Sequence, residues 1–150
     1  CFVEDTLAIL KEYDFPPSQL WIEITERCRD LPISMIKKTV TAFREAGIHI
    51  TMDDYGTGSS SSQMMLELPV EGVKIDMFFV KDILEEKKKQ ALVIGMINFA
   101  NAADLKICIE GIENDSLESY LRQFDVTCFQ GYHYSRSICQ DELMKLLIKP

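Results

Sequence analysis

The feature that most limits the possible folds of this chain is a regular alternation of strand-like and helix-like segments. Short runs of aliphatic and β-branched residues are separated by longer stretches with helical periodicity. The alternation predicts a parallel sheet covered by helices, an α/β fold. We predict strands at residues 20–24, 48–52, 72–75, 105–109 and 126–129, and helices at 2–13, 32–46, 62–67, 87–103, 116–124 and 141–148.

Right-handed crossovers leave two main architectures for such a chain, an open doubly wound sheet or a (β/α) barrel. A doubly wound nucleotide-binding sheet usually has a glycine-rich loop after its first strand. No such loop follows residues 20–24. The 150 residues fit one globular domain or a large part of one, and we treat residues 1–150 as a single unit.

Composition limits the partners. The formal net charge is −8, which argues against a DNA-binding surface because such surfaces carry a basic excess. A small nucleotide held through metal ions is still compatible, because acidic side chains are what divalent cations need. No apolar run approaches the roughly 20 residues of a membrane span, so we expect none in this chain.

The five cysteines indicate the compartment. Their number is odd and no pair has C-x-x-C spacing, which argues against a disulfide framework or a zinc site. Reduced thiols in a cytoplasmic protein are the favoured interpretation.

An ionisable or amide side chain ends every predicted strand. In a (β/α) barrel the carboxyl ends of the strands meet on one face, where barrel enzymes place their sites. Each residue alone has a structural explanation, such as a solvent-facing strand position or a turn entry. Their recurrence at every strand end favours one shared site, made of Glu23 and Glu26, Asp53 and Asp54, Lys74 and Asp76, Glu110 and Glu113, and Gln130.

The chemistry of this set predicts a divalent-metal site. Crowded carboxylates repel one another, and a hard cation such as Mg²⁺, Mn²⁺ or Ca²⁺ resolves the conflict. The adjacent Asp53 and Asp54 can serve a pair of ions that hold a phosphate diester and activate water. Lys74 can hold the attacking water or the developing phosphate charge. The loop Gly56-Thr57-Gly58 resembles a phosphate-binding nest, a weak signal by itself.

Five sequence blocks resemble the EAL domain family in identity, order and spacing. They are IEITE at 22–26, DDYGTGSSS at 53–61, LPVEGVKID at 68–76, IEGIE at 109–113 and FQGYHYSR at 129–136. The resemblance covers nearly the whole chain. It implies a (β/α)8 TIM-barrel-like fold with about five of the eight strands in this chain.

The resemblance implies metal-dependent hydrolysis of cyclic di-GMP to pGpG, with Mg²⁺ or Mn²⁺ as a pair of ions. Glu23, Asp53 and Asp54 resemble metal ligands. Lys74, Glu110 and Gln130 resemble catalytic residues, which contact the water, act as base or ion ligand, and support the water network. Glu26 resembles the anchor of the loop after Asp54, Asp76 and Glu113 resemble supporting residues, and Gly56, Thr57 and Gly58 are assigned to substrate binding.

The chain also departs from the family pattern. The Glu-Ala-Leu segment and the strand with a metal-binding Asn are not in these residues, so we expect the chain alone to be inactive. Ser59 and Ser62 stand where an aromatic residue and a leucine are usual, which bears on loop packing. The alternatives are a degenerate EAL module that binds cyclic di-GMP or a protein without catalysis, and an unrelated metal-dependent barrel hydrolase. A homodimer and an upstream fusion to sensor or GGDEF domains are also expected.

Removing three strands would open the barrel beside the strands at 20–24 and 126–129. We expect these apolar edges, and apolar side chains on the inner face of the sheet, to promote association with another chain.

Overall fold

The computed structural model describes residues 2–25, 31–58 and 61–148. Its strands form one parallel sheet in the order β1 (Trp21–Thr25), β2 (His49–Tyr55), β3 (Gly72–Ile75), β4 (Lys106–Ile109) and β5 (Cys128–Phe129). The helices are α1 (Phe2–Glu12), α2 (Ile33–Glu45), α3 (Ser61–Glu67), α4 (Met77–Val80), α5 (Lys87–Ala102), α6 (Asp115–Leu121) and α7 (Gln140–Leu147), with a 3₁₀ turn η1 (Pro17–Gln19). The predicted α/β fold is confirmed.

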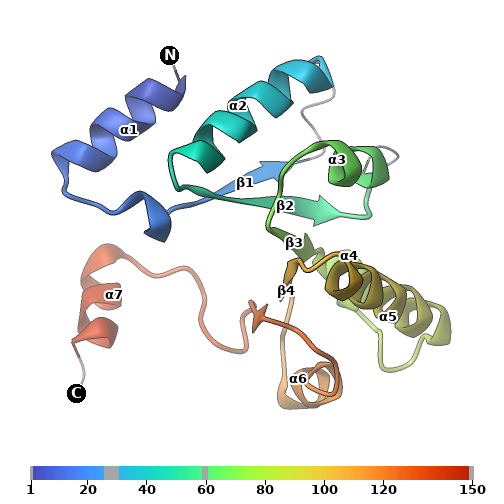
Figure 1. Ribbon diagram of the computed structural model, residues 1–150. Coiled ribbons are helices and arrows are strands. Elements are labelled where there is room, and N and C mark those ends of the chain that lie inside the picture. The colour runs from blue at the N-terminus through green and yellow to red at the C-terminus, as the bar shows by residue number, and fades with distance from the viewer. Residues whose placement is uncertain (1, 26–30, 59–60, 149–150) are drawn as a thin grey trace.

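Strand order decides between the two architectures that the residues left open. Each strand pairs with its neighbour in sequence, without the reversal of order that defines a doubly wound sheet. Figure 1 shows α2, α5 and α6 outside the curved row of strands. The arrangement is part of a TIM-barrel-like fold, with the strands' carboxyl ends on one side.

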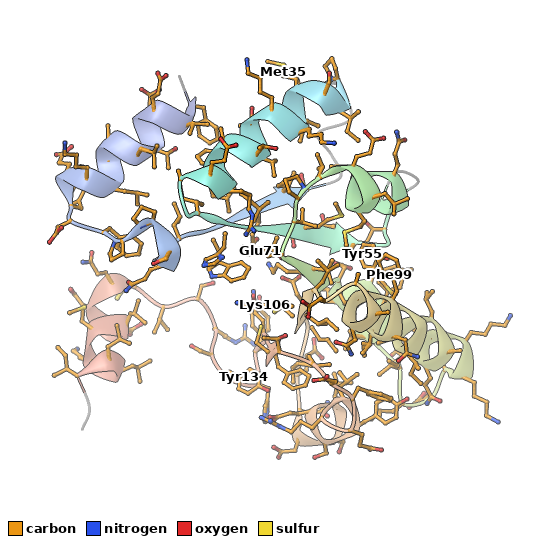
Figure 2. The ribbon with its side chains drawn as sticks, in the orientation of Figure 1. Met35, Tyr55, Glu71, Phe99, Lys106 and Tyr134 are labelled. Carbon is orange, nitrogen blue, oxygen red and sulfur yellow. The ribbon has the colours of Figure 1, made fainter. Side chains whose placement is uncertain are left out.

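The outer face of the sheet carries the hydrophobic core. Alternate strand residues point toward the helices, among them Ile50, Ile75 and Ile109, each with no exposed surface. At the end of β2, Tyr55 stacks on Phe99 of α5 with ring centroids 6.3 Å apart (Figure 2). Burial of this face against the helices holds the strands in register.

The concave face is mostly polar. The expectation of exposed apolar side chains there is met at Trp21, which is 38% exposed, but not along most of the face. The alternating residues there include Glu23, Thr51, Lys74, Lys106 and Cys108. Half of a strand faces the helices and half faces the interior, so apolar periodicity on one face says nothing about the other. The inner face is where the chemistry can sit.

Boundaries differ from the sequence predictions at functionally important places. β2 continues to Tyr55, so Asp53 and Asp54 lie in the strand and not in a turn.

The short helix α4 is absent from the sequence prediction. The carboxylate of Asp76 caps it by accepting a hydrogen bond from the Phe78 N–H at 2.7 Å. An Asp before an apolar run is the signal that could have predicted this helix.

None of the helices in the described ranges combines the length and apolar character that crossing a bilayer requires.

The loops that follow β4 and β5 lie against each other, which leads to a stability prediction. A Cβ at Gly131 would lie 2.1 Å from the backbone oxygen of Ile112, whereas a Cβ at Gly95 in α5 would meet nothing within 4 Å. We expect Gly131→Ala to lower the free energy of unfolding by about 1–3 kcal/mol. The matched Gly95→Ala should raise it by roughly 0.5–1 kcal/mol. Chemical denaturation measures both, and equal effects would contradict the close approach.

The edges of the sheet lead to a second prediction. Among the described residues, no strand pairs with the outer edge of β1, which lies beside an apolar groove of about 390 Å³ lined by Ile22, Leu31 and Met35 among others. The amphipathic helix α7 contains no buried residue. We expect the chain to self-associate at micromolar concentration through this groove.

Sedimentation velocity measures that self-association. Met35→Lys should weaken it, because the substitution places a charge in the groove, while Leu92→Lys at an exposed α5 position should not. A monodisperse, cooperatively folded monomer in the unmodified chain would show that the open edge is closed in another way.

Candidate functional site

The centre of the concave face is the ammonium group of Lys74 on β3. Its Nζ lies 2.5 Å from Glu110 Oε1, 2.9 Å from Glu23 Oε1 and 3.4 Å from Asp53 Oδ1. The side chain of Lys74 is only 9% exposed, and those of Asp53 and Glu110 are each 19% exposed. Strands β1, β2 and β3 thus direct Glu23, Asp53 and Lys74 to one point. Glu110, directly after β4, reaches the same point.

The electrostatics of Lys74 follow from this arrangement. Burial disfavours its charged form, but hydrogen bonds to Glu110 and Glu23 and the charges of Glu110 and Asp53 outweigh that penalty. The pKa of Lys74 is therefore raised well above the ordinary lysine value. Lys74 is a permanent cation at physiological pH, suited to holding an anionic group or a water and unsuited to accepting a proton.

The end of β2 is irregular in a way that serves the site. The register with β3 shifts between Met52 and Tyr55. Asp54 adopts φ +56°, a left-handed conformation that is uncommon for residues other than glycine and is tolerated by Asp. Such irregularities cost about 1–3 kcal/mol each and occur at functional sites. Here the bulge breaks the alternation that would otherwise send Asp53 and Asp54 strictly to opposite faces.

The acidic residues fit a hard divalent cation in chemistry, although their present spacing does not complete a site. Asp53 Oδ1 is buried and is not hydrogen-bonded, even though Lys74 Nζ is close enough for an ion pair. Three carboxylates surround one lysine, which leaves an excess of negative charge. An orphaned carboxylate oxygen in an acidic setting is the kind of ligand that Mg²⁺ or Mn²⁺ takes.

The carboxylates of Glu23, Asp53 and Glu110 do not form a closed metal site, because the ammonium group of Lys74 lies between them. Among residues 2–25, 31–58 and 61–148, the group that brings three ligand atoms within 4.8 Å of one another is Asp115, Glu118 and His133. That group lies at α6, where Glu118 also accepts a hydrogen bond from Arg122, an interaction that lowers the pKa of Glu118. It is an ion-pair cluster away from Lys74, and sequence reasoning did not single it out.

Gln130 follows β5 at the level where Glu110 follows β4. Ile109 pairs with Phe129, so the next residues on the two strands are Glu110 and Gln130. The backbone N–H of Gln130 donates to the Ile109 carbonyl at 2.9 Å, and its side chain is exposed. The structure places Gln130 on the rim of the site.

Other predicted residues lie farther out or serve the fold. Asp76 caps α4, and Glu113 is exposed and lines a cavity of about 240 Å³ beside α4. Glu26 lies outside the described residues. The supporting roles assigned to these residues remain predictions.

The loop Gly56-Thr57-Gly58 turns back on β2. The Thr57 backbone N–H and hydroxyl both donate to the Asp54 carbonyl, at 3.1 Å and 2.8 Å. Gly56 has φ +91°, a backbone conformation that favours glycine, and a Cβ there would also lie 2.7 Å from Met96 Cε. The observed contacts explain the loop as a turn that shapes the end of β2, and its role in substrate binding remains a prediction.

Sequence reasoning missed an aromatic and charged cluster deeper in the concave face. Trp21 stacks on His49 at 4.5 Å, and Lys106 Nζ lies 4.8 Å from the Trp21 ring centroid. Glu71 pairs with both His49 and Arg44. Figure 2 labels Glu71 and Lys106, which lie near each other at the centre of the molecule. Trp21 lies two residues before Glu23, so both are on the same face of β1. This alternation was the signal that could have placed Trp21 on the concave face.

Comparison with known proteins agrees with this geometry. The family profile described as "EAL domain" matches residues 1–137. The chain is 36% identical over 137 residues to the "Probable cyclic di-GMP phosphodiesterase PdeB" of Escherichia coli, covering 91% of this chain and 26% of that protein. The chain spans between 16% and 26% of the length of such curated relatives.

Solved structures show the same fold. The EAL domain of Mycobacterium smegmatis DcpA superposes with a TM-score of 0.92 at 31% identity, covering 97% of this chain and 66% of that one. A standalone EAL protein from Vibrio cholerae, solved in its c-di-GMP-bound form, gives a TM-score of 0.78 at 26% identity, covering 85% and 54%. The family resemblance seen in the sequence is confirmed.

The central ion-pair cluster leads to a prediction on stability and pH. Lys74→Met leaves the surrounding carboxylates without their cation, and we expect it to lower the free energy of unfolding at pH 7 by about 1–3 kcal/mol. Because the pKa of folded Lys74 is raised, its contribution is complete below the ordinary lysine pKa of about 10.4 and is lost only as pH rises through the folded value.

The loss should shrink on addition of millimolar Mn²⁺, which can replace the missing charge. Urea titrations with and without Mn²⁺, with Lys87→Met at an exposed α5 position as the control, measure it. A deficit that is the same with and without Mn²⁺ would contradict the electrostatic origin.

Proposed function

This chain belongs to the EAL domain family, and from that premise we propose that it is the carboxyl-terminal part of a cyclic di-GMP phosphodiesterase domain. The observation that carries the proposal is the cluster around Lys74, where Glu23, Asp53 and Glu110 converge within 3.4 Å of Nζ. An acidic site centred on a permanent cation suits a phosphate diester bound through metal ions. Cyclic di-GMP is the ligand or substrate named for two of the similar proteins.

Each residue has a role that its position supports. Glu23, Asp53 and Asp54 would hold Mg²⁺ or Mn²⁺, a pair of ions in the complete domain. When bound, such ions lower the pKa of water and offset phosphate charge. Lys74 keeps its proton and donates hydrogen bonds to the attacking water or to a phosphate oxygen. Glu110, 2.5 Å from Lys74 Nζ, orients that lysine and is positioned to ligate an ion or accept a proton.

Gln130 on the rim would support the water network beside Glu110. Its side chain is exposed at the end of β5, so it can reach solvent and substrate in the barrel mouth. The loop Gly56-Thr57-Gly58 is proposed to contact the substrate because its glycine-rich turn resembles a phosphate-binding nest.

The chain alone should be inactive because its metal site is incomplete. The carboxylates that surround Lys74 do not close around one ion, and the family's Glu-Ala-Leu and Asn ligands are not among these residues. The parent protein is proposed to be a cytoplasmic signalling protein with sensor or GGDEF domains upstream, acting as a homodimer.

Metal binding gives the first arm of the test. Calorimetric titration of the 150-residue chain with Mn²⁺ should show weak binding that Asp53→Asn largely removes. Asp125→Asn, at an exposed position after α6, is the matched control and should bind as the unmodified chain does. Identical isotherms for all three proteins would show that Asp53 does not bind the metal.

Turnover gives the second arm. Chromatography should detect pGpG at background level with the 150-residue chain, and at a substantial rate when the upstream strands are added. In the longer chain, Glu110→Gln or Lys74→Ala should lower kcat by about 10²-fold or more. Robust pGpG formation by the short chain would refute the incomplete site. Binding of cyclic di-GMP without turnover by the longer chain would instead identify a binding module.

A further inference from the structure

Two cysteines lie side by side on the concave face, one step below the candidate site. Lys74, Cys108 and Cys128 are direct Cα partners across β3, β4 and β5. Directly paired residues of parallel strands point to the same face, and their neighbours Ile107 and Ile109 are buried on the opposite face. The two thiols therefore share the side of the sheet on which Lys74 lies.

The spacing of the pair suits a covalent link. Both cysteines are free in this structure. Neighbouring strands lie about 4.7–4.9 Å apart, within the roughly 4.4–6.8 Å Cα separation that disulfides span. Cys108 is half-buried and Cys128 is exposed, so an oxidant meets Cys128 first.

The surroundings assign different roles to the two sulfurs. Cys108 lies on β4, between β3 and β5, and is half-buried, whereas Cys128 lies on the edge strand β5 and is exposed. A protected thiol beside an accessible one is the arrangement of a resolving and a reacting cysteine.

We propose that Cys108 and Cys128 form a redox-modification site, in which a hydroperoxide oxidises the two thiols to a disulfide that bridges β4 and β5. The inference concerns these two side chains alone and does not depend on the proposed function. A thiophilic metal is the less suitable occupant, because among the described residues no third ligand atom groups with the two sulfurs within 4.8 Å.

The reaction balances in two steps. The Cys128 sulfur attacks the peroxide O–O bond, forming a sulfenic acid, and its thiol proton leaves with the displaced hydroxide or alkoxide as water or alcohol. The Cys108 sulfur then attacks Cys128 Sγ. The S–S bond forms, the S–O bond breaks, and the departing hydroxide takes the Cys108 proton as water. The thiols are oxidised by two electrons and the peroxide is reduced.

The position of the link gives it a structural consequence. Glu110 and Gln130 follow the two cysteines by the same number of residues on adjacent strands. A disulfide would hold β4 and β5 at a set separation directly beneath both. It would also tie the edge strand β5, which is only two residues long, to the interior of the sheet.

Peptide mapping tests the proposal on the 150-residue chain, because each cysteine falls in a different tryptic peptide. The reduced protein, at low micromolar concentration, is treated with a few equivalents of hydrogen peroxide, blocked with N-ethylmaleimide and digested. We expect a dithiothreitol-sensitive species linking residues 107–122 to 123–136 in protein that migrates as a single chain under denaturing, non-reducing conditions. Cys139→Ser, which removes another exposed cysteine, should leave this species unchanged.

Single substitutions separate the two roles. Cys108→Ser should abolish the link and leave a Cys128 sulfenic acid that dimedone traps, with Cys108→Ala as a second version if the serine variant folds poorly. Cys128→Ser should leave Cys108 unmodified at the same peroxide dose. Sulfinic acid on Cys128 without a link in the unmodified chain, or equal yields of links to Cys139 or between molecules, would overturn the proposal.

Discussion

The structure depends on one interaction more than any other, the pairing of the buried Lys74 ammonium with carboxylates from neighbouring strands. A cation that is 9% exposed is tolerated only where opposite charges and hydrogen bonds replace its water. Glu23 and Glu110 provide the closest contacts, and Asp53 adds a longer one. The interaction thus ties β1, β2 and the end of β4 to β3, and it assembles the predicted catalytic groups with the same contacts.

The sheet separates its two tasks by face. Outward residues such as Ile50, Ile75 and Ile109 pack against helices and supply the hydrophobic stabilisation. Inward residues then need not be apolar, because the core does not depend on them. The bulge near Asp53 and Asp54 interrupts this alternation. In a regular strand, two consecutive side chains point to opposite faces and could not both reach the same site.

The open side of the sheet links fold and function. A closed barrel covers its strand edges and completes its site with ligands from all around the ring. In this chain the β1 edge adjoins an apolar groove, and the ammonium group of Lys74 lies among the carboxylates. Among the described residues, no strand pairs with the outer edge of β1. The cysteine pair lies on the opposite flank, so it is formed wholly by strands that are present.

The sequence by itself determined the α/β class, the strands and main helices to within a few residues, and the residues that end each strand, because periodicity and local chemistry are written in short segments. It also identified the family through blocks such as those at Asp53 and Lys74. The tertiary structure decided what depends on contacts between distant segments. Strand order excluded a doubly wound sheet, and β2 absorbed Asp53 and Asp54 beyond the predicted boundary. Only pairing across strands could show that the inner face is polar, that Lys74 sits among the carboxylates, and that Cys108 meets Cys128, since residues far apart in sequence acquire these neighbours only when the sheet forms.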